Sequence, residues 1–199
     1  MLLSNVHLGH TSRFLNTKIK PFLLGYRNNI HILNIFFTSF QFKLLINLII
    51  NLTSLRQKIL LVNDKSFFNF RSLLRLKTIF YVDKKWIGGS LTNFRRVRKS
   101  QKFIEFNNFY NGLGALRYMP SLVFFFDINM SKWPLVECSN LGIPVSAVVD
   151  SNTQFFNFIN YPIVGNNQSF EAIYLYLNIL RNAVIKGRQK ELLRILKIA

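Results

Sequence analysis

The sequence predicts an α/β fold in which helices cover both faces of a mainly parallel sheet. Residues 122–126 and Val145–Val149 carry this prediction, because both runs are almost wholly apolar and rich in β-branched or aromatic residues. Unbroken apolar runs of this length are typical of strands buried on both faces. The segment between them has the features of a short helix, with Ser131 as N-cap, Pro134 in the first turn and Gly142 after the end. Together they form a βαβ unit with a right-handed crossover.

Shorter apolar runs predict the remaining strands of the same sheet. They lie at Ile59–Val62, Ile79–Val82 and Tyr161–Val164, and residues 30–35 alternate weakly between apolar and polar positions, which indicates one more strand. Strands that alternate with helical segments are typical of α/β domains. A chain of 199 residues is long enough for one such domain with a sizeable core, so we predict a single domain over residues 1–199.

Apolar residues at helical spacing predict three further helices, over residues 37–55, 66–76 and 169–186. Thr38 or Ser39 can cap the first of them. We expect Gly187 to end the last one, because glycine is frequent directly after a helix. The residues from there onward, 187–199, are predicted to form a basic amphipathic tail.

Charge is the most unusual property of the composition. The chain has 26 Lys and Arg residues against 8 Asp and Glu residues, a formal net charge of +18, and no acidic residue precedes Asp64. Residues 1–29 form a basic, turn-rich N-terminal segment. An imbalance of this size is self-repulsive in a free globular protein, so we expect a polyanionic partner. Nucleic acid is the first candidate, and an anionic membrane surface that binds the tail is the second.

The apolar content, 50% of the residues, indicates a packed core and not a membrane-spanning segment. The longest apolar run, residues 44–52, contains Asn47 and Asn51 and is too short to span a bilayer. The N-terminus shows no secretory signal. Cys138 is the single cysteine, so it makes no internal disulfide, and we interpret it as a small buried residue, not a nucleophile.

Two carboxylates and two histidines are candidates for chemistry. Asp127 and Asp150 follow predicted strands, where α/β enzymes carry their active sites, so an enzyme or a phosphate-ligand-binding protein is one reading. We favour the reading in which both fix turns, because other titratable partners are scarce. His7 and His10 could present two imidazoles to a metal ion, but no carboxylate or thiol lies near them in sequence. We favour contacts to backbone carbonyls or RNA, and expect no metal, cofactor, small-molecule substrate or membrane partner.

The turn at Gly88-Gly89-Ser90 is a candidate phosphate site, because free N–H groups at the start of a helix attract anions. Its spacing matches neither a dinucleotide fingerprint nor a P-loop. The residues around it are rich in cations, and few acids are available to pair with them. We therefore favour phosphate contacts over a merely solvated helix face for Lys84, Lys85, Arg95, Arg96, Arg98, Lys99 and Lys102.

Several motifs follow one another along the chain. The first is His7-Leu-Gly-His10, followed by Thr11, Arg13, Asn16 and Lys18-Ile-Lys20-Pro21-Phe22, and it continues in Gly25-Tyr-Arg-Asn-Asn-Ile-His31-Ile-Leu-Asn34. Later come Trp86-Ile-Gly-Gly-Ser-Leu-Thr-Asn93, Asn140-Leu-Gly-Ile-Pro-Val145 with Val149-Asp150-Ser-Asn152, and Tyr161-Pro-Ile-Val-Gly-Asn166. In this order, and over nearly the whole chain, they resemble the bacterial-type small ribosomal subunit protein 2 family.

The resemblance implies a flavodoxin-like or Rossmann-like three-layer α/β/α sandwich without catalytic activity. It also implies a structural constituent of the small ribosomal subunit that binds small-subunit ribosomal RNA beside neighbouring ribosomal proteins. The motif positions that we interpret as RNA-binding are His7, His10, Arg13, Lys18, Lys20, Arg27, Trp86 and Asn93.

The chain departs from the family pattern in two places. The family usually carries a long helical hairpin after the Gly-Gly motif, and residues 95–119 leave room only for a shortened insertion. After Asn152 the family usually has an acidic, glycine-containing turn, whereas this chain has Gln154-Phe155-Phe156, so we do not transfer any metal or polar role of that turn. Abundant Phe (21 residues) with many Asn, Ile, Lys and Leu indicates an A+T-rich gene. We therefore expect a mitochondrially encoded protein, with a plastid as the alternative.

Overall fold

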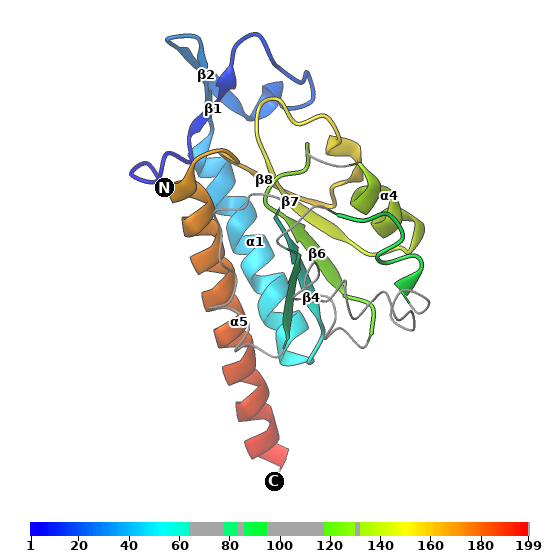
Figure 1. The fold of residues 1–199 in the computed structure, drawn as a ribbon. Helices are drawn as coiled ribbons and strands as arrows, with labels where there is room; N and C mark the ends of the chain where they lie inside the picture. Colours follow the sequence, from blue (N-terminus) through cyan, green and yellow to red (C-terminus); the bar gives the residue numbers. More distant parts are fainter. Residues whose placement is uncertain (64–77, 83–85, 95–117, 130–131, 199) are drawn as a thin grey trace.

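A parallel sheet forms the centre of the computed structural model, which describes residues 1–63, 78–82, 86–94, 118–129 and 132–198 (Figure 1). Its strands are the five that the apolar runs predict. They are β4 (Ile59–Val62), β5 (Ile79–Val82), β6 (Leu122–Phe125), β7 (Val145–Val149) and β8 (Tyr161–Val164). They lie side by side in the order β5-β4-β6-β7-β8, and every pair is parallel.

This order is that of a flavodoxin-like fold. Numbered from one to five along the chain, the strands lie in the order 2-1-3-4-5. The second strand is added on one side of the first, and the later strands are added on the other side, so the order of addition reverses between β4 and β6. The prediction of an α/β fold around a mainly parallel sheet is therefore confirmed. In such sheets, ligands bind outside the carboxyl ends of the strands, near the point of reversal.

Side chains of successive strand residues enter two separate cores, one on each face of the sheet. Leu61 and Phe124 belong to the core that helices α1 (Ile35–Ser54) and α5 (Phe170–Ile198) cover. Val62 and Phe125, the next residues along each strand, belong to the opposite core, which helix α4 (Trp133–Asn140) covers. Figure 1 shows α1 and α5 side by side on one face and α4 on the other. The described structure is thus a three-layer sandwich, and burial on both faces explains the unbroken apolar strands.

Helix α1 begins two residues before its predicted start. Its N-cap is Asn34, whose side-chain oxygen accepts hydrogen bonds from the N–H groups of Phe36 and Phe37. The prediction of Thr38 or Ser39 as the cap is wrong, because both lie inside the helix. The buried hydroxyl of Thr38 instead donates to the carbonyl of Val164, 2.6 Å away, and ties α1 to the end of strand β8.

Helix α5 continues through Gly187 to Ile198, so the expectation that this glycine ends the helix is wrong. The reason is the contact with α1. A Cβ atom on Gly187 would lie 1.7 Å from Thr53 Oγ1 and 2.8 Å from the carbonyl oxygen of Ile50. Glycine costs helix stability of roughly 1 kcal/mol relative to alanine, but here it lets two helix backbones approach closely.

The predicted basic tail is therefore the last part of a long helix, which Figure 1 shows extending past the sheet. Glu191 pairs with Arg56 at 2.5 Å, and Lys190 donates to the side chain of Asn51, so these polar residues face the end of α1. Leu192 and Leu196 are exposed. Arg194 between them is exposed as well, so the amphipathic character of the tail stays a prediction.

The basic N-terminal segment (residues 1–29) takes part in a second, antiparallel sheet, which the sequence did not predict apart from one strand. Its strands are β1 (Leu8–Thr11), β2 (Leu23–Arg27) and β3 (Ile30–Leu33), in the order β1-β3-β2. A short 3-10 helix, Lys20–Phe22, precedes β2, and another, Phe156–Phe158, precedes β8. Asn28 and Asn29 join β2 to β3 with φ angles of 50° and 59°, as a two-residue type I′ hairpin requires.

Three sequence predictions concern residues outside the described part of the structure. They are the helix over residues 66–76, the Ser131 N-cap and nearly all of the shortened insertion at 95–119. Helix α4 begins after Lys132 without a side-chain cap, and Pro134 lies in its first turn as predicted.

Among the described helices, α1 alone is long and apolar enough to cross a membrane by length and composition. The expectation that the apolar segment at residues 44–52 is too short to span a bilayer is therefore wrong, because the helix that contains it has 20 residues. This is weak evidence for a membrane span, since the core helix of a globular protein meets the same criterion. Phe42, Leu45 and Ile49 of this helix are buried in the core of the sandwich.

We expect Gly187→Ala to lower the free energy of unfolding by about 1–3 kcal/mol, the usual cost of overpacking, although alanine favours the helix. Urea unfolding measures this change. The matched control is Gly88→Ala, because a Cβ atom at Gly88 would meet nothing within 4 Å. Equal stability of the two variants would contradict a tight contact between α1 and α5 at this point.

Candidate nucleic-acid interface

The buried carboxylate of Asp150 fixes the N-terminal segment to the parallel sheet. Asp150 follows strand β7 and is fully buried. Its Oδ2 lies 3.1 Å from Nδ1 of His10, and the backbone N–H of His10 donates to Ser151 Oγ at 2.9 Å. Strand β1 is thereby held against the carboxyl end of β7. The predicted RNA-binding residue His10 thus has a structural contact, with 28% of its side chain still exposed.

Gly9 makes this approach possible. A Cβ atom at this position would lie 3.1 Å from both Asp150 Oδ1 and Ser151 Oγ, and 3.3 Å from the Cβ atom of His31. A larger residue would therefore push the strand away from the carboxylate. This contact gives the His7-Leu-Gly-His10 motif a physical explanation.

The chain after β1 follows the same edge of the sheet. The N–H of Asn16 donates to the carbonyl of Ser151 at 2.9 Å, and its side-chain amide donates to the carbonyl of Thr153. Lys18 Nζ donates to the side chain of Asn157. Residues between β1 and the Lys20–Phe22 turn are therefore fixed at several points. Three of the predicted RNA-binding residues, Arg13, Lys18 and Lys20, are exposed on this part of the chain. A fourth, Arg27, is exposed at the end of strand β2.

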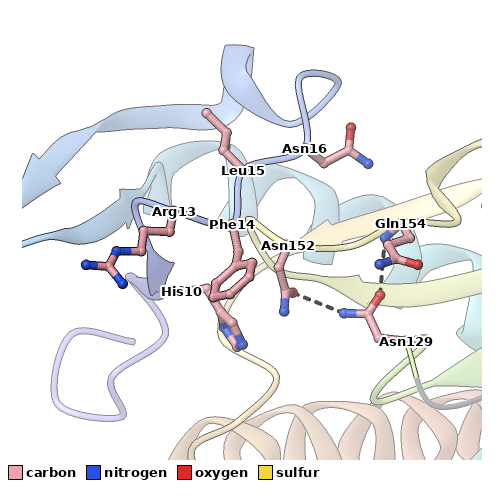
Figure 2. A pocket seen from close by; sticks show the side chains of 8 residues that line it. All are labelled: His10, Arg13, Phe14, Leu15, Asn16, Asn129, Asn152 and Gln154. Carbon is pink, nitrogen blue, oxygen red and sulfur yellow. Dashed lines mark hydrogen bonds between the residues drawn. The ribbon is translucent and has the colours of Figure 1, made fainter.

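A cleft of about 710 Å³ lies between the N-terminal segment and the ends of strands β6 and β7 (Figure 2). We call it the strand-end cleft. It combines one cation, one imidazole, two large apolar side chains and four amides. The lining residues are His10, Arg13, Phe14, Leu15, Asn16, Asn129, Asn152 and Gln154.

Asp127 holds the loop after β6. Its Oδ1 accepts hydrogen bonds at 3.1 Å from the N–H of Asn129 and from the side-chain amide of Asn167. Both strand-end carboxylates are therefore buried and engaged in contacts that position loops. The reading of Asp127 and Asp150 as turn-fixing residues is confirmed.

The Gly88-Gly89-Ser90 turn does not offer its N–H groups to a phosphate, which corrects the sequence interpretation of this motif. The carboxylate of Glu137, on α4, accepts from the backbone N–H groups of Gly89 and Leu91 at 2.8 Å each and of Thr92 at 3.1 Å. It also accepts from Nε1 of Trp86 at 2.9 Å. An internal carboxylate thus occupies the anion site that the turn forms.

Trp86 is consequently a core residue. Its side chain is buried in the cluster that covers the α4 face of the sheet. Sequence reasoning missed Glu137, although one signal was present: it is one of only 8 acidic residues and lies between the apolar residues of a short helix. Asn93 is exposed beside the turn. The predicted phosphate contacts Lys84, Lys85, Arg95, Arg96, Arg98, Lys99 and Lys102 lie outside the described residues.

The histidines do not form a metal centre in the part of the chain that the structure describes, where no three His, Cys, Asp or Glu side chains gather. The Nδ1 atoms of His7 and His31 are buried, and neither has a hydrogen-bond partner among the described residues. His7 is half-buried, and His31, on strand β3 beside β1, is buried.

Comparison with known proteins identifies the family to which the chain belongs. The profile of the family described as Ribosomal protein S2 matches residues 1–112 and 102–187. The chain belongs to the ribosomal protein S2 family. The resemblance found in the motifs is thereby confirmed at the level of the family, and so is the expectation of a small-subunit ribosomal protein that is not an enzyme.

Curated members of the S2 family match nearly the whole chain, each under the name small ribosomal subunit protein uS2. The protein from Pseudoalteromonas atlantica is 34% identical over 222 residues, which cover 96% of this chain and 91% of the relative. That from Baumannia cicadellinicola is 32% identical, with 98% and 97% covered. That from Buchnera aphidicola (Cinara cedri) is 32% identical, with 94% and 89% covered.

We expect Glu137→Gln to destabilise the protein by about 1–3 kcal/mol, because one of the two acceptor oxygens becomes an amino group that faces backbone N–H donors. Trp86 fluorescence can report the change in a Trp133→Phe background, because the chain has two tryptophans. Its emission should shift to longer wavelength as water reaches the indole. Glu171→Gln, at an exposed position of α5, is the control. An unchanged Trp86 spectrum and stability would contradict the role of Glu137.

Cys138 should be unreactive in the folded protein. Burial, with a smaller contribution from Glu137, raises the pKa of this thiol from 9.0 to about 12. The thiol is therefore neutral at pH 8, and a disulfide reagent should modify it only after unfolding in urea. Since the unfolded chain loses this proton near pH 9 and the folded one near pH 12, stability should fall as the pH rises between these values. Rapid modification of the folded protein at pH 8 would be inconsistent with this burial.

Proposed function

We propose that this S2 protein is a structural constituent of the small ribosomal subunit that binds small-subunit ribosomal RNA through its N-terminal segment and supports translation. The observation that carries the proposal is the group of exposed cations Arg13, Lys18 and Lys20 on backbone that hydrogen bonds fix to the parallel sheet, with Arg27 exposed at the end of strand β2. A fixed cationic surface binds phosphates without first having to become ordered.

The distribution of acidic residues supports a polyanionic partner. Asp127, Glu137 and Asp150 are buried and engaged inside the fold. Glu191 pairs with Arg56. In the described part of the chain, therefore, most of the scarce carboxylates are not available to neutralise the cations of the surface. Ribosomal RNA supplies the missing negative charge, and counterion release makes its binding sensitive to salt.

Recognition on this surface is mainly of RNA shape and backbone. A-form RNA hides its base edges in a deep, narrow groove, so side chains on a flat protein surface meet phosphates and 2′-hydroxyl groups. Three further motif positions differ in their surroundings, namely His7, Trp86 and Asn93. His7 is half-buried, Trp86 is a core residue and Asn93 is exposed. We therefore keep Asn93 as an RNA contact and assign Trp86 to the support of the turn.

We further propose that the chain is one domain with a shortened insertion at residues 95–119. Two findings support this. The family profile matches in two segments that meet at residues 102–112, inside the proposed insertion. The alignment to the Pseudoalteromonas atlantica relative is 222 residues long, against 199 in this chain, so the relative carries residues without a counterpart here.

We infer from the composition that the gene is mitochondrial, with a plastid gene as the alternative. The support is the abundance of Phe, Asn, Ile, Lys and Leu, which A+T-rich codons encode. In that compartment the neighbours of the protein would be the ribosomal RNA and the other proteins of the organelle's small subunit. Fractionation of the cell tests this inference, since recovery of the protein with cytosolic ribosomes would overturn it.

The test of the proposed function is sedimentation of an organelle extract at increasing salt. The protein should travel with the small subunit at moderate salt. Replacing Arg13, Lys18, Lys20 and Arg27 with Gln should release it at lower salt and flatten the salt dependence by about one unit of slope for each phosphate that the protein no longer neutralises.

The control for this experiment removes the same number of cations elsewhere. Lys43, Arg181, Lys186 and Arg194, all exposed on helices α1 and α5, are replaced with Gln. Net charge then falls equally, so an equal loss of binding would argue against a specific role of the N-terminal segment. Wild-type protein that remains at the top of the gradient, away from the small subunit, would refute the proposed function itself.

A further inference from the structure

We propose that the strand-end cleft holds one unpaired nucleotide of the ribosomal RNA, with its base stacked on Phe14. The inference rests on the proposed function and adds to it a specific site. The cleft lies outside the carboxyl ends of β6 and β7, next to the reversal of strand order between β4 and β6. Its volume of about 710 Å³ lies within the range of small-ligand sites and is sufficient for a nucleotide.

Phe14 is the stacking platform. Its side chain is 63% exposed and lines the cleft (Figure 2). The backbone around it is fixed, because its N–H donates to the carbonyl of Thr11 at 3.1 Å and the nearby Asn16 is bonded to the loop after β7. An aromatic ring exposed on fixed backbone is the arrangement that single-stranded nucleic-acid sites use, since every base offers a flat apolar face.

Amide side chains lie on the other side of the cleft, where a base edge would be. Asn129 donates from its amino group to Asn152 Oδ1 at 3.0 Å and accepts from the N–H of Gln154 at 3.2 Å. The bond from Asn129 fixes the side-chain oxygen of Asn152. The amino group of Asn152 has no partner among the described residues, and Figure 2 shows this side chain beside the cleft. We assign this group as a donor to an acceptor on the base edge.

The charges that line the cleft suit a nucleotide as well. Arg13 is exposed at the rim and can contact a phosphate, while His10 separates the cleft from the buried Asp150. No acidic residue is among the described lining residues. Paired RNA cannot present a base here, because its bases are stacked inside the helix, so the occupant is an unpaired nucleotide. A free mononucleotide shares this chemistry, and the experiment distinguishes the two sources.

The experiment probes the reactivity of base edges in small subunits assembled with wild-type or variant protein. Phe14→Ala removes the stack, and Phe14→Trp retains it. Asn152→Asp keeps the oxygen that accepts from Asn129 and replaces only the amino group assigned to the base. The controls are Phe36→Ala, at an exposed ring of α1, and Asn182→Asp, which adds the same charge at an exposed position of α5.

One nucleotide that wild-type protein and Phe14→Trp protect from base modification should become at least about fivefold more reactive with Phe14→Ala, the smallest change expected from loss of a base–aromatic stack. Asn152→Asp should have a similar effect, and neither control should. All variants should enter the subunit, because the cations outside the cleft are retained.

Three outcomes would overturn the inference, and they are distinct. If the variants assemble normally and no nucleotide changes reactivity, the cleft is empty of RNA while the proposed function stands. If AMP, GMP, CMP or UMP binds the isolated protein at Phe14 and Asn152 and no nucleotide in the subunit responds, the occupant is a free nucleotide. If the wild-type protein does not assemble into the subunit, the proposed function fails and the inference fails with it.

Discussion

The position of the whole basic surface depends on one buried carboxylate. Asp150 lies at the end of a central strand, and the imidazole of His10 and the neighbouring Ser151 tie the N-terminal segment to it. A carboxylate removed from water must be matched by donors, since an unmatched buried charge is costly. The donors come from strand β1 and from the turn after β7, so satisfying the charge also fixes the geometry between the two sheets. Gly9 keeps the distance short enough. The cations of the N-terminal segment are therefore carried by a rigid support.

The central sheet could be predicted from the sequence because its strands are determined by local composition. The runs at Ile59–Val62, Ile79–Val82, Val145–Val149 and Tyr161–Val164 have the bounds that the structure shows. The first three are buried along their whole length between two cores, and such strands consist mostly of apolar residues. Gly187 shows where local reasoning fails. After an apolar helical run, a glycine has the same local appearance at a helix end and at a helix crossing, and only the partner helix, more than a hundred residues earlier, distinguishes the two.

The candidate site was harder to predict for the same reason. Exposed cations such as Arg13 and Lys18 could be assigned from charge and motif alone, whereas the residues that position them could not. Glu137 satisfies the turn at Gly89 from a separate helix, 48 positions away along the chain. The strand-end cleft combines residues of the N-terminal segment with loops after β6 and β7. Contacts between segments so far apart leave no periodic pattern in a single sequence.

The contact between α1 and α5 also constrains the order of events during synthesis. Helix α1 lies in the first third of the chain and α5 at its end, and the carbonyl of Val6 accepts from the N–H of Asn166. Pairings of such long sequence separation form late, because a large loop must close before they contribute any free energy. A nascent chain that has reached only β7 can already pack α1 on the sheet, but the side of α1 that meets β8 and α5 has no partner yet. That side of α1 thus stays open until α5 itself has been synthesised, so the helix layer on this face of the sheet is completed only after all five strands.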